Sequence, residues 1–254
     1  KHNRKVRWRS EALLEGARQG LYPAPLILSF AQAHILMRLA PAIVLLGSLA
    51  LLTPSCVIEL GDFNGPRVQK DVELSYTSSA PVREFYVDAY NGNVSITEGT
   101  GSTITGTSRV KAQGRNDEQA KERLDSMIWN FSEEANGRVV LRLSKPVHGG
   151  TNNCGATADL QVPAGMRILV DTSNGGVTIT GNFPYAFVDS SNGAVSLNGV
   201  KEVEVDTGNG PVRVMGADGK VIVDTSNGPV VLIGNSEDFH LDTSNGPVTI
   251  ELSK

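Results

Sequence analysis

Cysteine, histidine and aromatic residues are scarce in this 254-residue chain. It contains 2 Cys, 4 His and 2 Trp, and aromatic residues make up 6% of it. Two cysteines cannot build the disulfide framework on which many small secreted domains depend. The sequence also lacks a Gly-x-Ser-x-Gly motif and a histidine spacing typical of metal sites. We therefore expect a protein that is not an enzyme and that uses no cofactor and no metal ion.

A five-residue motif, Asp-x-x-Asn-Gly, occurs five times in the last third of the chain. Its aspartates are 18, 17, 18 and 18 residues apart, and so regular a period indicates one structural unit stacked on itself. We expect the motif to form a structural turn in each repeat, with the Asp side chain accepting hydrogen bonds from nearby backbone N–H groups. The turn residues are Asp171, Asn174, Gly175, Asp189, Asn192, Gly193, Asp206, Asn209, Gly210, Asp224, Asn227, Gly228, Asp242, Asn245 and Gly246.

The repeated aspartates also admit a second interpretation, a row of Ca²⁺ sites between coils. Carboxylates stacked in register lie about 4.8 Å apart, and Ca²⁺ prefers oxygen ligands of this kind. However, the Gly-Gly-x-Gly-x-Asp nonapeptide of calcium-binding repeats is absent. We therefore favour the turn role and expect Ca²⁺ to leave the melting temperature unchanged.

Apolar residues recur two apart on both sides of each Asn-Gly. Four apolar columns, one and three residues before the Asp and six and eight residues after it, predict two strands per repeat, each with one buried face. Asn-Gly also favours two-residue hairpins, which would give an antiparallel meander or a sandwich. Because the columns keep a near-constant period, we favour an all-β fold, a parallel β-solenoid or β-helix with coils of about 18 residues.

An earlier copy of the repeat lies before an insertion. Phe85, Val87, Asp88 and Asn91-Gly92 stand at the same offsets as in the later copies. The sequence thus predicts a repeat domain over residues 82–254, with an insertion at 99–167 and regular repeats at 168–254. Within the insertion, Asn116–Phe131 has the pattern of a capped amphipathic helix, which we expect to cover an end or flank of the repeats.

The N-terminal part has the features of an export signal. The apolar run Leu39–Leu52 suits a signal peptide, expected over residues 37–55, and is shorter than the ~20 residues that span a bilayer. The small residues before Cys56 resemble the lipobox of bacterial lipoproteins, so we expect lipidation of Cys56 and a membrane-anchored lipoprotein. Ordinary cleavage after Ser55 and an uncleaved anchor are the alternatives.

The segments on either side of the expected signal peptide have different expected roles. Residues 1–36 carry a net charge of +4 and are expected to be an upstream or non-native extension, the alternative being a basic cytoplasmic tail. Residues 56–81 are expected to be a linker and lead-in. Without residues 1–55 the net charge is −9, which argues against nucleic acid as a partner. Cys154 is expected to be either a small buried residue or an exposed thiol.

The segment Val82–Lys254 resembles a bacterial β-strand-repeat family known as "putative adhesin" or domain of unknown function. The resemblance rests on Phe85–Val94, the helical insert, Leu160–Met166 with its Val-Pro-Ala-Gly, and the repeated Asp-Thr-Ser-Asn-Gly. It covers about two thirds of the chain. The resemblance implies export and a β-solenoid, and it supplies no catalytic residues.

Together these features predict a non-enzymatic lipoprotein of the bacterial cell envelope, periplasmic or surface-facing, with a scaffold or adhesin-like binding domain for a protein or surface ligand. One alternative is a periplasmic protein-partner or oligomerisation module that associates end to end through the open strand edge of residues 247–254. Another is a carbohydrate-active β-helix enzyme, although coils of 17 or 18 residues leave little room for catalytic loops. The sequence reveals no strip of aromatic residues for binding a glycan.

Overall fold

The structure is a computed structural model that describes residues 65–78, 82–148 and 153–252. The expected signal peptide and the lipidation site Cys56 lie outside the described residues. Within them the fold is all-β, as the sequence predicts, with one α-helix, α2 (Asp117–Asp125). None of the helical segments described is long and apolar enough to cross a membrane.

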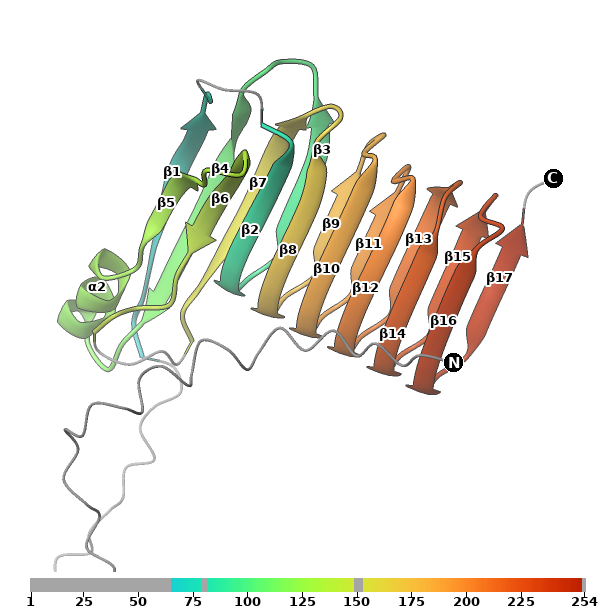
Figure 1. Cartoon of the computed structure of the whole chain (residues 1–254). Helices are drawn as coiled ribbons and strands as arrows, with labels where there is room; N and C mark the ends of the chain where they lie inside the picture. Colours follow the sequence, from blue (N-terminus) through green and yellow to red (C-terminus); the bar gives the residue numbers. More distant parts are fainter. Residues whose placement is uncertain (1–64, 79–81, 149–152, 253–254) are drawn as a thin grey trace, which may run out of the picture. The chain divides into compact units, whose positions relative to one another are not determined.

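The strands form two sheets (Figure 1). The first has nine strands in the order β1-β4-β7-β3-β9-β11-β13-β15-β17, and the second has eight in the order β16-β14-β12-β10-β8-β2-β6-β5. Their bounds are β1 Arg67–Tyr76, β2 Glu84–Asn91, β3 Val94–Gly99, β4 Ile104–Gln113, β5 Trp129–Glu133, β6 Arg138–Leu143, β7 Gly155–Pro163, β8 Arg167–Asn174, β9 Val177–Thr180, β10 Tyr185–Asn192, β11 Val195–Asn198, β12 Glu202–Asn209, β13 Val212–Ala217, β14 Val221–Asn227, β15 Val230–Gly234, β16 Phe239–Asn245 and β17 Val248–Leu252.

From β8 onward the chain alternates between the two sheets, and each strand pairs in parallel with the strand one repeat away. The pairing keeps the repeats in register, so that Asp189 lies opposite Asp206 and Val195 opposite Val212. The early copy joins the same register, because Asp88 lies opposite Asp171 across β2 and β8. One period of the motif in the sequence therefore corresponds to one step from a strand to its neighbour in the same sheet.

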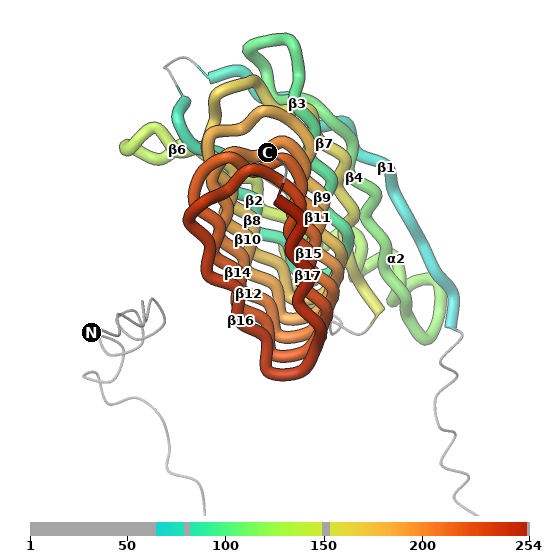
Figure 2. Tube along the Cα trace, turned by 90° about the vertical axis from the view of Figure 1, so that its right-hand side faces the viewer, coloured from blue at the N-terminus to red at the C-terminus, as the bar shows by residue number. Residues whose placement is uncertain are grey.

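The two sheets face each other across a single apolar core, as the view in Figure 2 shows. The four apolar columns of the repeats point into it, and in the four repeats from β8 to β15 each of these side chains is at most 2% exposed. They are Ile168, Ala186, Val203 and Val221; Val170, Val188, Val205 and Val223; Val177, Val195, Val212 and Val230; and Ile179, Leu197, Val214 and Leu232. Burial of these columns supplies the main driving force for stacking.

The insertion makes both sheets mixed rather than wholly parallel. It adds β6 beside β2 and β7 beside β3 in parallel, and then β5 and β4 pair antiparallel on the far sides. Strand β1, which precedes the repeats, pairs antiparallel with β4. The expected parallel pairing between successive coils thus holds for the repeats. The end that the insertion builds is partly antiparallel, because β5 leads directly into β6 through a short hairpin rather than through a full coil.

The helix of the insertion is shorter than the sequence predicts. It begins as expected, with the Asn116 side chain accepting a hydrogen bond from the Gln119 backbone N–H at 2.8 Å, and it buries Ala120 and Leu124. It ends at Asp125 with Ser126 as C-cap, and Trp129–Glu133 forms β5 instead. The aromatic residues of that segment favour a strand, and Phe131 packs on Tyr76 with ring centroids 5.1 Å apart.

A column of buried hydroxyls also lines the interior, one residue after Asp171, Asp189, Asp206 and Asp224. Thr172, Ser190, Thr207 and Thr225 are each 1% exposed, and their hydroxyl oxygens have no hydrogen-bond partner among the described residues. A buried polar group without a partner costs free energy. This column therefore weakens the stack that the apolar columns stabilise.

Replacing Thr207 by valine is expected to raise the free energy of unfolding by about 1 kcal/mol, because valine keeps the shape and removes the unpartnered hydroxyl. Urea denaturation measures the change. The control is Thr178→Val on the exposed face of β9, which should change stability by less than about 0.5 kcal/mol. A Thr207→Val protein that is less stable than wild type would contradict the prediction.

Candidate functional site

The bends of the repeats are formed by asparagine and glycine. Each Asn ends a strand of the eight-stranded sheet, and Gly175, Gly193, Gly210 and Gly228 follow it with φ between 144° and 150°. The Asn side chains stack as a ladder in which each amide donates to the Asn one repeat earlier. The N···O distances are 2.8–3.0 Å along Asn91, Asn174, Asn192, Asn209, Asn227 and Asn245. This ladder ties every bend to the next.

The aspartates of the motif lie inside the strands, three residues before each bend. Asp88, Asp171, Asp189, Asp206, Asp224 and Asp242 are in register on the outward side of the eight-stranded sheet, and we call them the aspartate row. At one end Arg142 Nε donates to Asp88 Oδ2 at 3.1 Å. No group of three or more His, Cys, Asp or Glu side chains suited to a metal ion occurs in the described residues.

The aspartate near the centre of the row, Asp206, has a raised pKa. The pKa of Asp206 is raised above its ordinary value, first by burial and then by the neighbouring carboxylates of Asp189 and Asp224. A carboxyl with a raised pKa in the folded protein binds protons more tightly than in the unfolded chain. Its charge therefore lowers stability above the folded pKa, and that penalty is relieved as the pH falls toward the unfolded value.

Replacing Asp206 by asparagine is accordingly expected to raise the melting temperature at neutral pH. Solvent screening of this exposed group keeps the gain below about 1 kcal/mol. The gain should shrink as the pH falls from the folded pKa toward the unfolded pKa of aspartate, about 3.9, and should be absent below it; high salt should also reduce it. Thermal melts across pH test this, with Asp218→Asn, outside the row, as control; a gain independent of pH would contradict it.

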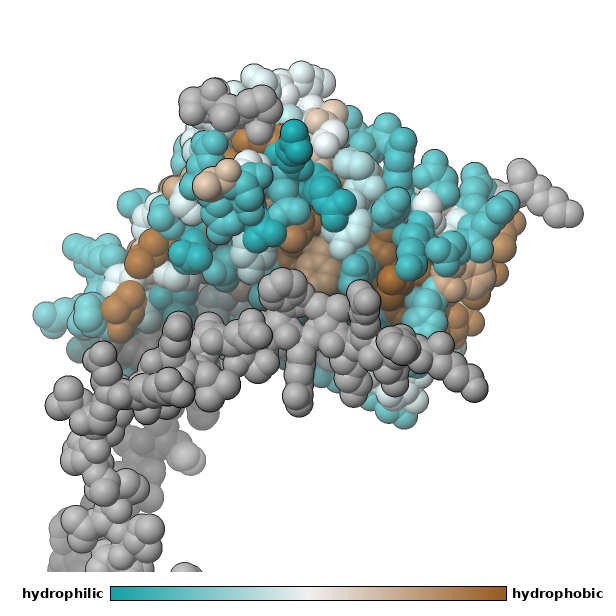
Figure 3. Space-filling model, viewed as in Figure 1, coloured by the Kyte–Doolittle hydropathy of each residue, from teal (hydrophilic) through white to brown (hydrophobic). Residues whose placement is uncertain are grey.

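A row of apolar side chains runs beside the aspartate row on the same outward face. Tyr86, Leu169, Phe187 and Ile222 stand two residues before an aspartate, and the register places them on neighbouring strands with Glu204 between Phe187 and Ile222. We call these four side chains the apolar row; each is partly exposed. Figure 3 views this face and shows hydrophobic side chains gathered between hydrophilic ones.

A third row, on the far side of the apolar row, carries tyrosine and arginine. The Arg167 guanidinium lies 3.9 Å from the centre of the Tyr185 ring, and that of Arg138 lies 5.7 Å from the Tyr86 ring. Arg138 and Arg167 both form ion pairs with Glu84. The apolar row is thus bordered by carboxylates on one side and by paired arginines on the other.

The tyrosines of this face are held protonated. Burial, with a smaller contribution from the carboxylates of Asp171 and Asp88, raises the pKa of Tyr86 to about 12. Burial and the hydrogen bond that the Tyr185 hydroxyl donates to Glu204 Oε2 at 2.9 Å raise the pKa of Tyr185. Both hydroxyls therefore remain neutral hydrogen-bonding groups at physiological pH.

The apolar row escaped the sequence-based interpretation. Its residues are Tyr, Leu, Phe and Ile in four different copies, and the first copy is separated from the second by 83 residues, the distance from Asp88 to Asp171. The signal was nevertheless present, since all four occupy the position two residues before the aspartate. Aligning the first copy with the later ones would have placed Tyr86 beside Leu169 and Phe187.

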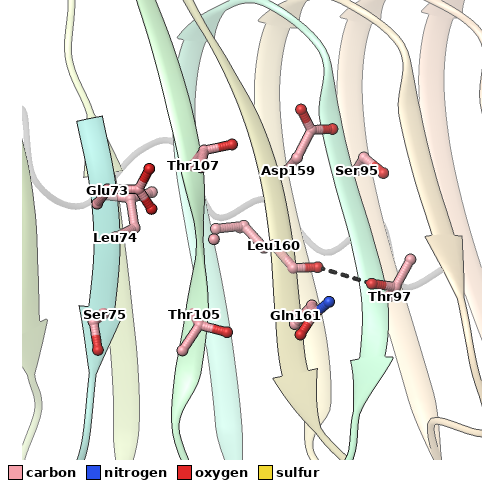
Figure 4. A pocket seen from close by; sticks show the side chains of 11 residues that line it. Glu73, Leu74, Ser75, Ser95, Thr97, Thr105, Thr107, Asp159, Leu160 and Gln161 are labelled. Atoms are coloured by element: carbon pink, nitrogen blue, oxygen red, sulfur yellow. Dashed lines mark hydrogen bonds between the residues drawn. The ribbon is translucent and has the colours of Figure 1, made fainter. Parts of the chain in front are cut away.

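The outer face of the other sheet is hollowed where β1, β4, β7 and β3 meet (Figure 4). The hollow has a volume of about 570 Å³ and is bordered by short hydroxyl side chains with Glu73, Asp159 and Gln161 among them. Thr97 Oγ1 donates to the backbone carbonyl of Leu160 at 3.3 Å. Figure 4 shows no aromatic ring among the labelled side chains, so this hollow offers hydrogen bonds without an apolar platform.

Cys154 lies apart from these rows, whereas His240 stands two residues before Asp242, in the register of the apolar row. Cys154 is 4% exposed, which agrees with the expected buried residue, and its backbone carbonyl accepts a hydrogen bond from Asn91 Nδ2 at 3.3 Å. His240 lies on the outward face of β16, one strand beyond Ile222. Neither position is part of a catalytic arrangement among the described residues.

Comparison with known proteins gives distant structural similarity. The chain matches no protein-family model and no curated protein. Among solved structures it is similar to a putative cell adhesion protein from Clostridium sporogenes ATCC 15579 (12% identity, 72% of this chain and 100% of that one, TM-score 0.41). It is also similar to putative adhesins from Bacteroides fragilis NCTC 9343 (12%, 72% and 97%, TM-score 0.34) and Parabacteroides distasonis ATCC 8503 (12%, 76% and 98%, TM-score 0.27). Likeness at this level transfers no function, so function has to be argued from this chain's own residues.

Proposed function

We propose that this chain is a non-enzymatic, lipid-anchored protein of the bacterial cell envelope whose repeats form a β-solenoid scaffold with an adhesin-like binding face. The observation that carries the proposal is the apolar row on the outward side of the eight-stranded sheet. Partly exposed apolar side chains bordered by polar ones are typical of interaction surfaces. We place the binding face over β2, β8, β10, β12 and β14.

The stacked repeats suit such a face because they fix its side chains. Each strand is hydrogen-bonded to neighbours on both sides, and the asparagine ladder ties the bends together. Consecutive side chains of a row are therefore held about 4.8 Å apart. A surface that is ordered before binding loses little conformational entropy when a ligand arrives.

The test is the adherence of bacteria that produce the full chain. Leu169→Asp places a charge in the middle of the apolar row and points outward, so the core columns stay intact. We expect bacteria that produce this variant to adhere about tenfold less to a layer of cells of the same strain than bacteria that produce the wild type. The two proteins are compared at equal amounts in the cell envelope. The matched control is Thr178→Asp on the outer face of the other sheet. Equal adherence of wild type and Leu169→Asp would refute the binding face.

The proposed lipid anchor at Cys56 has its own test. Cys56→Ala removes the thiol that would carry the lipid, and we expect the variant to move from the membrane fraction to the soluble envelope fraction. Cys154→Ala serves as the control, because it removes the other cysteine and should leave the protein membrane-associated. Retention of Cys56→Ala in the membrane fraction would refute the anchor.

End-to-end association is a second candidate, favoured by the strands β16 and β17 at the edges of the two sheets. The apolar columns reach these edges, and within the part of the chain that the structure describes Phe239, Val248 and Ile250 are 37–43% exposed. A further coil or a second copy would cover them. Light scattering over a range of concentrations tests this: Val248→Lys should abolish any self-association of the full chain, and a wild-type protein that stays monomeric would refute it.

A further inference from the structure

We propose that the binding face takes a β-linked polysaccharide whose sugars carry protonated amino groups, with the polymer lying across the strands along the apolar row. The inference rests on the proposed function and names the ligand of that same face. It is carried by three properties of the face: its apolar platform, the charge of the row beside it, and the spacing of both rows.

The apolar platform suits the flat side of a sugar ring. Tyr86 and Phe187 lie on strands that are separated by β8 alone, with Leu169 between them. Their rings therefore recur at about twice the strand spacing, roughly 9.6 Å. The carbon-bound hydrogens of a pyranose form an apolar face that can cover such a ring and remove it from water.

The charge beside the platform calls for a cation. The aspartate row contributes one carboxylate per strand, and among the described residues Asp189, Asp206 and Asp224 have no basic side chain within ion-pair distance. The ion pairs of this face lie at its other end, where Arg142 pairs with Asp88 and Arg138 and Arg167 pair with Glu84. Ammonium groups placed along Asp189–Asp224 would relieve the repulsion between the carboxylates.

The spacing distinguishes a sugar polymer from a basic peptide. An extended polypeptide advances about 3.3 Å per residue and turns alternate side chains away, so cations on one side recur at roughly 6.7 Å and drift out of register with carboxylates about 4.8 Å apart. A β-linked sugar chain advances by one ring over a length close to one strand spacing. Consecutive rings of a β-1,4-linked chain are flipped, so amino groups on one edge recur every second ring, close to two strand spacings. Every second carboxylate of the aspartate row can then meet an ammonium group while the rings lie over the apolar row.

The polar flank on the other side supports the same orientation. The Tyr185 hydroxyl on this flank donates to the Glu204 carboxylate, which lies in the register of the apolar row between Phe187 and Ile222, and both groups offer further acceptors to sugar hydroxyls. The hollow on the nine-stranded sheet also offers hydroxyls, but it has neither an aromatic platform nor a row of carboxylates. We therefore place the polysaccharide on the eight-stranded face.

The test is titration calorimetry of the full chain with a β-1,4-linked glucosamine hexamer at mildly acidic pH, where its amino groups are charged. The comparison probes are the N-acetylglucosamine hexamer, cellohexaose and hexalysine. We expect the glucosamine hexamer to bind at least tenfold more tightly than each of the other three, and the affinity to fall with added salt.

Variants locate the binding. Phe187→Ala and Asp189→Asn should each weaken binding of the glucosamine hexamer about tenfold, whereas Phe187→Tyr should keep it, because the ring remains. Asp159→Asn, which removes a carboxylate from the outer face of the other sheet, is the matched control and should leave the affinity unchanged. Circular dichroism melts show whether each variant is folded, and Phe187→Tyr keeps the test valid if Phe187→Ala is not.

Four results would overturn the inference: no binding of the glucosamine hexamer, equal binding of the neutral hexamers, equal binding of hexalysine, or an equal loss with Asp159→Asn. They are distinguishable from failure of the proposed function. If the hexamer does not bind while Leu169→Asp still abolishes adherence, the face binds a ligand of another chemistry. If adherence is also unaffected, the binding face itself is refuted.

Discussion

Replacing Gly210 by alanine should lower the free energy of unfolding by about 3–5 kcal/mol, combining the strain of an unfavourable backbone conformation with overpacking. Gly210 has φ 145°, a backbone angle that residues other than glycine rarely adopt. A Cβ added there would overlap the carbonyl oxygen of Gly193 one repeat earlier. The neighbouring bend cannot move away, because its own N–H donates to the next repeat: Gly193 N–H to Asn209 O at 2.8 Å. The clash would thus force two repeats apart.

Gly165→Ala provides the matched control for this prediction. Gly165 also has a positive φ, 79°, but no heavy atom lies within 4 Å of the position that its Cβ would take. Only backbone strain of about 1–2 kcal/mol should follow there. Urea denaturation of both variants separates the two contributions. Equal losses at both positions would mean that close contact between bends contributes nothing.

The bends illustrate how far the sequence predicts this fold. The period, the four apolar columns and the Asn-Gly pairs are local and repeated, so each copy supports the interpretation of the others. Asp and Asn were harder to separate, because both side chains can bond the backbone at a turn. The distinction arises from pairing between repeats: Asn174 meets Asn91 and Asn192 at the bend, whereas Asp171 lies within β8.

The insertion and the binding face were less predictable, for a different physical reason. The antiparallel pairing of β1, β4 and β7 joins segments that share no repeat, so no periodicity reports it. The end of α2 at Asp125 depends on β5 pairing with β6, a tertiary contact that outweighs helix propensity. The apolar row likewise exists only once β2 lies beside β8, which brings Tyr86 to Leu169.

The energetics of a stack should depend on position along it, and the pair Leu232 and Ile250 can show this. The two residues occupy the same apolar column and lie opposite each other in β15 and β17, but Leu232 is fully buried and Ile250 is 42% exposed. Leu232→Ala should lower the free energy of unfolding by about 2–5 kcal/mol, because it leaves a cavity between two repeats. Ile250→Ala should cost less, about 1 kcal/mol, since 42% of that side chain is already exposed and its loss at an edge strand leaves no enclosed cavity.

Amide hydrogen exchange would show where the lost stability appears. In a stack, each repeat contacts only its neighbours, so a weakened interface uncouples what lies beyond it. We expect Leu232→Ala to speed exchange in β14–β17 while β8–β11 keep their protection, and Ile250→Ala to speed exchange in β17 alone. Uniform loss of protection over both ends in Leu232→Ala would instead mean that the described domain unfolds as one cooperative unit. In that case, a substitution that destabilises β14–β17 would also reduce the stability of the outward rows over β2–β10. In the expected case, the platform of Tyr86, Leu169 and Phe187 stays ordered.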